Sequence, residues 1–317
     1  MTITKTIAAT AVAALMSTGA YAQDIAVIAG SIEDGFFNLI KKGVDDATLM
    51  VEANGGTVNY LRTPNYDNFG PDLVTLINQA VAQGVDGIAI PIWVPESEIP
   101  ALKAAAEQGI VIMQYNAGHE VKDQVGAINF FGSDEYIAGK EGGKYLAEKG
   151  AKHILCHIQV PGSINLETRC KGVTEGAEAM GAKVTTLRVP ANLDGDVTGT
   201  AEAIKSELIG DPSIDAIMNL AAWASDASAN AVSQIGGKQM IGTFDMNPAV
   251  LERIQAGTQT MAIDQQPYLQ GFLATSMLFA NLKFGTNIST NPVLTGPAIV
   301  DASNVAGALA GVALGAR

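Results

Sequence analysis

The stretch IAVIAGSIEDGFFNLIKKGVDDA, Ile25–Ala47, contains an apolar run, a short polar loop and a region in which apolar residues recur at helical spacing. This order predicts a strand, a loop and a helix. Phe36 and Phe37 lie just past the carboxyl end of the strand, the edge at which open parallel sheets bind small molecules. Both rings could belong to the core. Adjacent helical residues point about 100° apart, however, so we expect at least one ring to face a ligand.

Composition limits the classes of partner. The chain has 317 residues, of which 48% are hydrophobic and 16% charged, enough for two ordinary domains with large cores. Its formal net charge of −13 argues against a nucleic acid or an anionic membrane as a partner. This charge is compatible with a small neutral ligand.

Residues Met1–Ala22 are predicted to be a secretory signal rather than part of the fold. Lys5 gives a positive start, Ile7–Met16 is an apolar run too short to span a bilayer, and the segment ends in a small-x-small pattern. Cleavage is expected before Gln23. The residue directly after the expected cleavage point is not a cysteine, so no lipid-anchor signal is present. No later segment reaches the roughly 18 apolar residues of a membrane span. We therefore expect a soluble exported protein, located in the periplasm where the cell has an outer membrane.

Short apolar strands alternate with amphipathic helices along the rest of the chain, which predicts parallel sheets covered by helices on both faces. In the first half, strands are expected at Ile25–Ala29, Thr57–Leu61, Gly87–Pro91, Ile110–Gln114 and Gln124–Phe131. In the second half, they are expected at His153–Val160, Lys183–Leu187, Ala216–Leu220 and Gln239–Thr243.

The second half repeats the first. Lys42-Gly43-Val44 matches Lys171-Gly172-Val173, and Leu61-Arg62-Thr63-Pro64 matches Leu187-Arg188-Val189-Pro190, each pair about one domain apart. We therefore predict an α/β protein with two similar doubly wound parallel-sheet lobes, a multi-strand hinge and a ligand cleft between the lobes. The expected N-terminal lobe is residues 23–132 plus 266–293, and the C-terminal lobe is residues 133–265 plus 294–317.

Signatures of catalysis and of metal binding are scarce. The sequence has no G-x-S-x-G, no phosphate-binding loop and no dinucleotide fingerprint. His153 and His157 are four apart, but on the expected strand they would lie about 13 Å from each other. Cys156 and Cys170 are interpreted as two buried free thiols, although export permits a disulfide. We expect no catalytic residue, no metal and no cofactor.

Polar and aromatic side chains recur just after the predicted strands, and planar donors combined with aromatic faces suit a neutral polyhydroxylated ligand. The candidate ligand-binding residues are Asp34, Phe36, Phe37, Trp93, Asn116, Asp134, Arg169, Trp223, Asp245 and Gln265. The alternatives are a helix cap for Asp134, surface pairs for the other charged residues and rim packing for the tryptophans.

An ordered set of motifs resembles the periplasmic sugar-binding proteins of ABC importers, the ribose/galactose-binding type whose fold is shared with LacI-type repressors. The set consists of Phe36-Phe37, Ser133-Asp134 ahead of Gly139, Arg169 before Lys171-Gly172, Phe244-Asp245, and Gln265 before Pro267. The resemblance covers nearly all of the chain after the signal. It implies that Phe36 or Phe37 stacks on a sugar and that Arg169, Asp245 and Gln265 bind it. Asp34 stands where the family has an Asn, and Asp134 matches less directly.

Two departures from the family pattern bear on the ligand. The family's Asp-Arg pair after the fourth strand is Tyr115-Asn116 here, and its Asn after the Ala216–Leu220 strand falls near Ala221, close to Trp223. These departures point away from ribose or galactose and leave open another sugar or a polyol such as an inositol or a tetritol.

The expected function is that of the solute-binding component of an ABC transporter, a monomer that closes on its ligand and delivers it to a membrane permease. One alternative is a sensory binding protein that serves a chemoreceptor or a kinase. An exported carbohydrate-active enzyme would need a nucleophile and base or a metal. A LacI-type repressor would need an N-terminal helix-turn-helix and no export signal.

Overall fold

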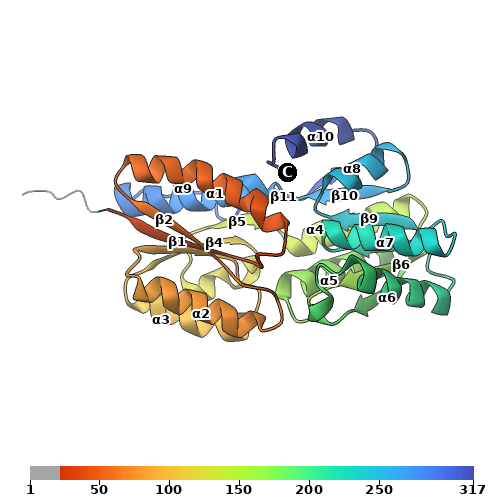
Figure 1. Ribbon diagram of the computed structural model, residues 1–317, viewed down its shortest axis with the longest axis horizontal. Helices are drawn as coiled ribbons and strands as arrows, with labels where there is room; N and C mark the ends of the chain where they lie inside the picture. Colours follow the sequence, from red (N-terminus) through yellow and green to blue (C-terminus); the bar gives the residue numbers. More distant parts are fainter. Residues whose placement is uncertain (1–21) are drawn as a thin grey trace, which may run out of the picture.

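The computed structural model describes residues 22–317, so residues 1–21 of the predicted signal lie outside the described part of the chain. Two α/β lobes lie side by side along the long axis of the molecule (Figure 1). Each lobe is built on one six-stranded sheet. Between residues 22 and 317, none of the helices combines the length and the apolar character needed to cross a bilayer.

The sheet of the first lobe is parallel throughout. Its strands, from one edge to the other, are β11 (Val293–Gly296), β5 (Phe130–Ser133), β4 (Val111–Asn116), β3 (Gly87–Ile90), β1 (Asp24–Ala29) and β2 (Thr57–Arg62). Strands β1, β3 and β5 are buried along almost their whole length, as expected of strands covered on both faces.

The sheet of the second lobe has the same order of strands. They are β12 (Ala298–Val300), β10 (Met261–Asp264), β9 (Met240–Phe244), β8 (Ala216–Asn219), β6 (His153–Ile158) and β7 (Lys183–Arg188). Only the edge strand β12 runs antiparallel to its neighbour. Strand for strand, β1 to β5 correspond to β6 to β10, which confirms the predicted pair of similar doubly wound lobes. The exact residue boundaries of the lobes stay a prediction.

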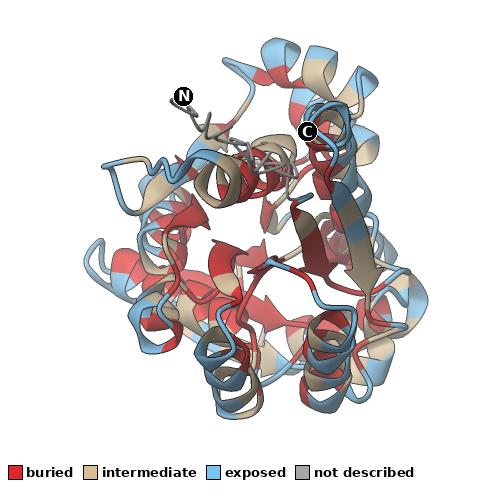
Figure 2. Ribbon diagram, turned by 90° about the vertical axis from the view of Figure 1, so that its left-hand side faces the viewer, coloured by how far each residue is buried: buried red, intermediate tan, exposed pale blue. Residues whose placement is uncertain are grey.

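Helices cover both faces of each sheet, with buried strands between helices whose outer faces are exposed (Figure 2). The first lobe carries α1 (Phe36–Ala53), α2 (Phe69–Ala82), α3 (Pro95–Glu107), the 3-10 helix η1 (His119–Val125) and α9 (Pro267–Phe284). The second lobe carries α4 (Glu135–Glu148), α5 (Ile164–Glu178), the 3-10 helix η2 (Ala191–Leu193), α6 (Val197–Gly210), α7 (Ala222–Gln234), α8 (Pro248–Gln255) and α10 (Val305–Ala313).

The repeated sequence motifs have matching structural roles. Gly43 of α1 lies against α9, and a β-carbon there would be 2.1 Å from the carbonyl oxygen of Tyr268. Gly172 of α5 lies against α4 in the same way, 2.3 Å from the carbonyl oxygen of Tyr136. The repeated glycine therefore allows two helices to cross in contact in each lobe, because any side chain would force the backbones apart.

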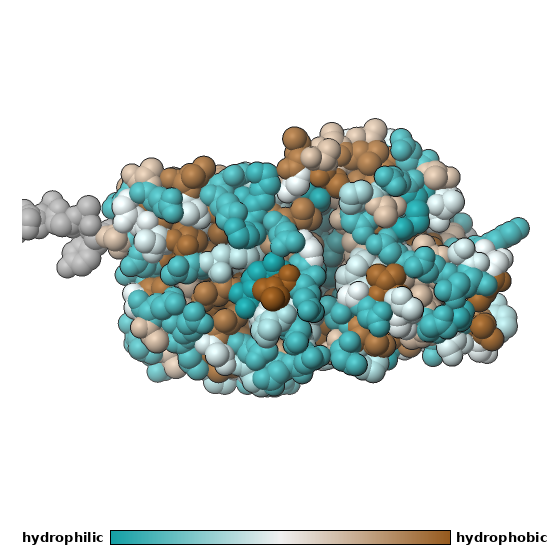
Figure 3. All heavy atoms as spheres, viewed as in Figure 1, coloured by the Kyte–Doolittle hydropathy of each residue, from teal (hydrophilic) through white to brown (hydrophobic). Residues whose placement is uncertain are grey.

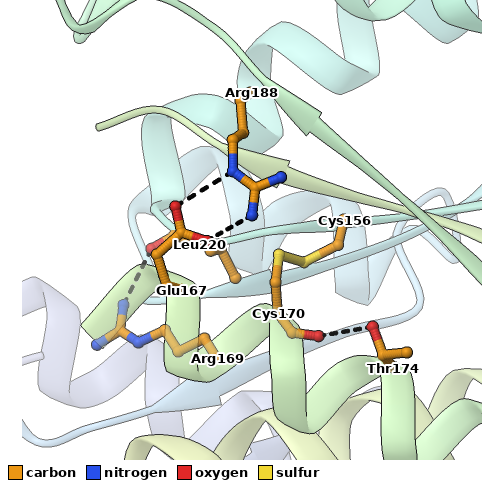
Figure 4. Close-up of a disulfide and its surroundings, with 7 residues drawn as sticks. All are labelled: Cys156, Glu167, Arg169, Cys170, Thr174, Arg188 and Leu220. Carbon is orange, nitrogen blue, oxygen red and sulfur yellow. Dashed lines mark hydrogen bonds and ion pairs between the residues drawn. A yellow bond between two sulfur atoms is a disulfide. The ribbon is translucent and has the colours of Figure 1, made fainter. Parts of the chain in front are cut away.

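The repeated arginine braces the loop that follows the first strand of each lobe. Arg62 donates to the carbonyl oxygens of Gly30 and Asp34. Arg188 donates to the carboxylate of Glu167 in α5, as Figure 4 shows, and Glu167 Oε1 in turn accepts from the backbone N of Gly162 in the loop. Both loops lead into a helix that borders the space between the lobes.

The chain crosses between the lobes three times, at β5 to α4, at β10 to α9 and at β11 to β12. The predicted multi-strand hinge thus consists of these three connections. A β-carbon on Gly296 would lie 2.6 Å from Ser133 Oγ and 2.8 Å from the carbonyl oxygen of Asp264, so the three crossings pass close together.

Three expectations from the sequence are corrected. The strand predicted at Gln124–Phe131 is displaced, because η1 ends at Gly126 in the left-handed conformation and β5 begins only at Phe130. The helix α10 was not predicted, since its Ala/Gly-rich sequence has no clear polar face.

The prediction of free thiols is also wrong. A disulfide joins Cys156 of β6 to Cys170 of α5, with 5.9 Å between their Cα atoms (Figure 4). Both residues are buried. Helix α5 packs directly over β6, which brings the two side chains together.

Candidate functional site

A cavity of about 350 Å³ lies between the two lobes. Its polar lining comes from loops at the carboxyl ends of the strands of both sheets, the edge at which open α/β sheets bind ligands. From the first lobe, the predicted site residues that line it are Asp34, Phe36, Phe37, Trp93 and Asn116. From the second lobe, they are Arg169, Trp223, Asp245 and Gln265.

Asp134 is the predicted site residue that does not line the cavity. Its Oδ1 accepts a hydrogen bond of 2.9 Å from the backbone N of Ile137, which makes it the N-cap of α4. The next residue, Glu135, is buried and pairs with Arg169. Neither Asp134 nor Glu135 lines the cavity, and Glu135 acts on the site only by holding Arg169, which does.

Aromatic rings form one wall of the cavity. The ring of Trp93 lies 5.6 Å from that of Phe37 and 5.1 Å from that of Phe69, and Tyr66 lies 4.7 Å from Phe69. Phe37 is buried, whereas Phe36 packs edge-on against it from a half-exposed position. Such a wall can cover the apolar C–H face of a ring-shaped ligand while the polar side chains meet its hydroxyl groups.

Glu98 fixes the backbone that carries Trp93. One carboxyl oxygen, Oε2, accepts from the backbone N of Trp93 at 2.8 Å and of Val94 at 2.6 Å. Glu98 is fully buried, and this burial raises the pKa of its carboxyl to about 8. The protonated form is therefore the major form at neutral pH, so the interior of this lobe does not contain an unpaired charge at this position.

Arg169 is buried, and most of its donors are used within the protein. Its Nε and Nη2 form a bidentate ion pair with the carboxylate of Glu135, with distances of 2.6 Å to Oε2 and 2.9 Å to Oε1. Nη2 also donates to Gln265 Oε1 and Nη1 to the carbonyl oxygen of Leu220. The guanidinium lies 4.3 Å from the centre of the Phe244 ring. Of its five N–H groups, one on Nη1 is left for a ligand.

Asn116 and Asp245 lie at matching positions, at the ends of β4 and β9. Both have left-handed backbones, with φ of 61° and 65°, and Gln266 at the hinge is the only other non-glycine residue between 22 and 317 with a positive φ. Strained backbone of this kind concentrates at functional sites. Burial raises the pKa of the Asp245 carboxyl to about 7, and Gln265 donates to it.

Two acidic groups, one from each lobe, line the cavity. Asp34 accepts from the Tyr66 hydroxyl at 2.9 Å, and burial raises the pKa of its carboxyl. Asp194, from the loop after β7, has its pKa raised to about 8 by burial and by the charges of Asp34 and Glu33. Tyr66 and Asp194 were not predicted. The rule that polar residues follow strands applies to both, but longer loops separate them from their strands.

The lobes touch at the mouth of the cavity. The backbone N of Ile164, the first residue of α5, donates to the carbonyl oxygen of Trp93 in the opposite lobe at 2.9 Å. The structure is therefore that of a closed clamp.

The histidines do not form a metal site. His153 bonds to Ser213 and Thr185, while His157 is buried on β6. Across residues 22–317, no group of three or more His, Cys, Asp or Glu side chains could hold a metal ion.

Two similar α/β lobes that close on a polar and aromatic cavity define a protein of the two-lobed ligand-binding class. Residues 8–287 match the family described as the periplasmic binding protein domain, and the chain belongs to this family. The family resemblance noted in the sequence is confirmed.

Known proteins similar to this chain bind sugars or polyols. A carbohydrate transporter from Acidothermus cellulolyticus 11B, solved in complex with myo-inositol, is 35% identical with a TM-score of 0.85, over 93% of this chain and 100% of that one. The xylose/arabinose-binding protein XylF of Sulfolobus acidocaldarius is 25% identical over 85% of this chain and 69% of that protein. A solute-binding protein from Burkholderia graminis C4D1M, in complex with D-arabinose, shares the fold with a TM-score of 0.76 and 23% identity, over 89% of this chain and 96% of that one.

Proposed function

We propose that this chain is the solute-binding component of an ABC importer and that it captures a neutral sugar or cyclic polyol between its lobes. The observation that carries the proposal is the cavity itself. An aromatic wall from one lobe faces Arg169, Asp245 and Gln265 from the other, so only a ligand held by both lobes satisfies the site. The myo-inositol complex of the relative that is 35% identical supports a cyclic polyol as the first ligand to test.

Closure of the hinge couples binding to delivery. The open form admits the ligand, and the second lobe then gains hydrogen bonds that it can make only when the lobes meet, which shifts the equilibrium toward the closed form. Several hydrogen bonds to charged groups, at about 1.5–3 kcal/mol each, offset the costs of association and allow micromolar affinity, about −8 kcal/mol.

The family and the predicted signal support a periplasmic setting. The protein acts in the periplasm, and its partner is the membrane permease, which recognises the composite surface of the closed lobes. The cavity lining offers hydrogen bonds and ring contacts, and it needs no cofactor to hold a polyol. We propose that the ligand leaves the protein chemically unchanged.

Calorimetry with myo-inositol, D-xylose, D-arabinose and D-galactose tests this function. At least one of these ligands is expected to bind with micromolar affinity and to raise the unfolding temperature through mass action. Asp245→Asn is expected to weaken binding at least ten-fold. Asp134→Asn, which keeps a competent N-cap outside the cavity, is the matched control and should bind normally. Failure of all four ligands to bind, or chemical conversion of any of them, would contradict the proposal.

A further inference from the structure

The last residues of the chain lie at the boundary between the lobes. Helix α10 packs on α8 and ends in a Schellman motif, in which Gly315 N bonds to Val312 O and Ala316 N to Gly311 O. Gly315 has a φ of 67°, which turns the chain back toward the hinge. A β-carbon on Gly315 would be 3.8 Å from Cδ of Lys42 in the opposite lobe. Figure 1 shows this end of the chain between the two lobes, and Figure 3 shows hydrophobic surface over the adjoining helix.

The turn places Arg317 in the cavity. Arg317 and Val312 both line it, beside Gln265. The stem of Arg317 lies over Gly311, where a β-carbon would be 2.8 Å from Arg317 Cδ. A glycine at this position of α10 therefore leaves room for the arginine side chain.

One edge of the guanidinium is anchored at the hinge. Arg317 Nε lies 3.3 Å from Oδ2 of Asp264, whose side chain is only 2% exposed, while Oδ1 of Asp264 accepts from Gln266 N. Asp264 directly precedes Gln265, which contacts Arg169 and Asp245. Arg317 is thus fixed next to the polar end of the cavity.

The other edge of the guanidinium is unused. The Arg317 side chain is 36% exposed, and its terminal nitrogens donate no hydrogen bond to any residue in the described range 22–317. We propose that Arg317 is a ligand-contacting residue, whose two terminal nitrogens donate to a pair of neighbouring hydroxyl oxygens of the bound sugar or polyol. This inference rests on the proposed function and adds to it a specificity residue from the C-terminal segment.

A double variant separates ligand contact from a purely structural role. Arg317→Ala alone leaves Asp264 unpaired and buried, so it can disturb the hinge as well as the contact. Combining it with Asp264→Asn removes both charges, and Asn can still accept from Gln266. If Arg317 binds the ligand, this double variant loses affinity about 10- to 100-fold, the equivalent of a hydrogen bond to a charged group. If Arg317 serves only as a counter-ion, the double variant binds as the unaltered protein does.

A second pair of variants moves the arginine without removing it. Gly311→Leu fills the space under the Arg317 stem and is expected to lower affinity. Gly307→Leu, on the same helix with open space around it, is the matched control and should not. The probes are myo-inositol, D-xylose, D-arabinose and D-galactose, and their binding is measured by calorimetry. Normal binding by the double variant would overturn this inference alone, whereas no binding of any probe by the unaltered protein would overturn the proposed function and the inference with it.

Discussion

Asn116 and Asp245 occupy equivalent places in the two lobes, take up the same left-handed backbone and border the same cavity. Asn116 Nδ2 donates to Gln270 Oε1, and Asp245 accepts from Gln265, so each is tied to a residue at or beyond the β10–α9 crossing. The two lobes therefore match even in these two strained residues. Through their hydrogen bonds, Asn116 and Asp245 connect the cavity to the hinge.

The backbone and the side chain of Asp245 can be tested separately. Asp245→Gly and Asp245→Ala both remove the carboxyl, so both are expected to weaken ligand binding. Both residues must adopt the left-handed backbone at this position, which costs alanine about 1–2 kcal/mol and glycine almost nothing. The free energy of unfolding in urea should therefore be lower for the alanine variant than for the glycine variant. Equal stabilities would contradict the assignment of strain to this position.

Arg169 is expected to matter for stability as well as for binding. Arg169→Ala leaves the Glu135 carboxylate buried and unpaired, which should cost about 3–5 kcal/mol of unfolding free energy. Arg169→Met combined with Glu135→Gln removes both charges and should recover much of the stability while binding stays weak. Denaturation and calorimetry on the same samples check this. If the double variant regained affinity, Arg169 would have no role in contacting the ligand.

Glu98 gives the stability of the first lobe a dependence on pH. The folded-state pKa is raised to about 8 from an ordinary 4.5, so the contribution of the protonated carboxyl is complete below about pH 4.5 and is lost as the pH rises through 8. The free energy of unfolding should fall between pH 5 and 8, and Glu98→Gln should make this fall shallower. The raised pKa values of Asp194 and Asp245 keep the rest of it. Glu96→Gln, an exposed position on the same helix, is the control and should leave the slope unchanged.

The disulfide is expected to stabilise the second lobe. Cys156 and Cys170 are 14 residues apart, and closing a loop of about this length contributes roughly 3 kcal/mol. Replacing both with alanine should lower the unfolding midpoint by a corresponding amount. Affinity should change little, because Glu135 and Gln265 still hold the neighbouring Arg169. A midpoint that did not move would show that the bond contributes nothing to stability.

Closure can be tested through a single backbone hydrogen bond. Ile164→Pro removes the N–H that donates to Trp93 O, and proline is tolerated at the first position of a helix after the extended Ser163. Ile164→Ala keeps the N–H and controls for the lost side chain. The proline variant is expected to bind more weakly than the alanine variant and to release ligand faster in stopped-flow measurements. Identical release rates would show that this contact does not hold the lobes together.

The sequence was sufficient to predict the two lobes and nine of the residues that line the cavity, because both follow from short-range patterns. Buried strands, helices and the polar residues after each strand are local features, and the repeated Lys-Gly-Val motif revealed the duplication. Contacts between elements that are distant in the sequence could not be predicted from it. The pairing of Arg169 with Glu135 depends on how α4 and α5 pack, and the disulfide depends on how α5 lies over β6. Asp194 becomes a cavity residue only when the lobes meet.

The bond between Ile164 and Trp93 joins main chain to main chain, so its donor and acceptor do not depend on which side chains surround them. Every side chain that faces the cavity could be exchanged during evolution without removing this hydrogen bond between the lobes. The choice of ligand and the stability of the closed form can then change independently of each other, and one fold can bind many different nutrients.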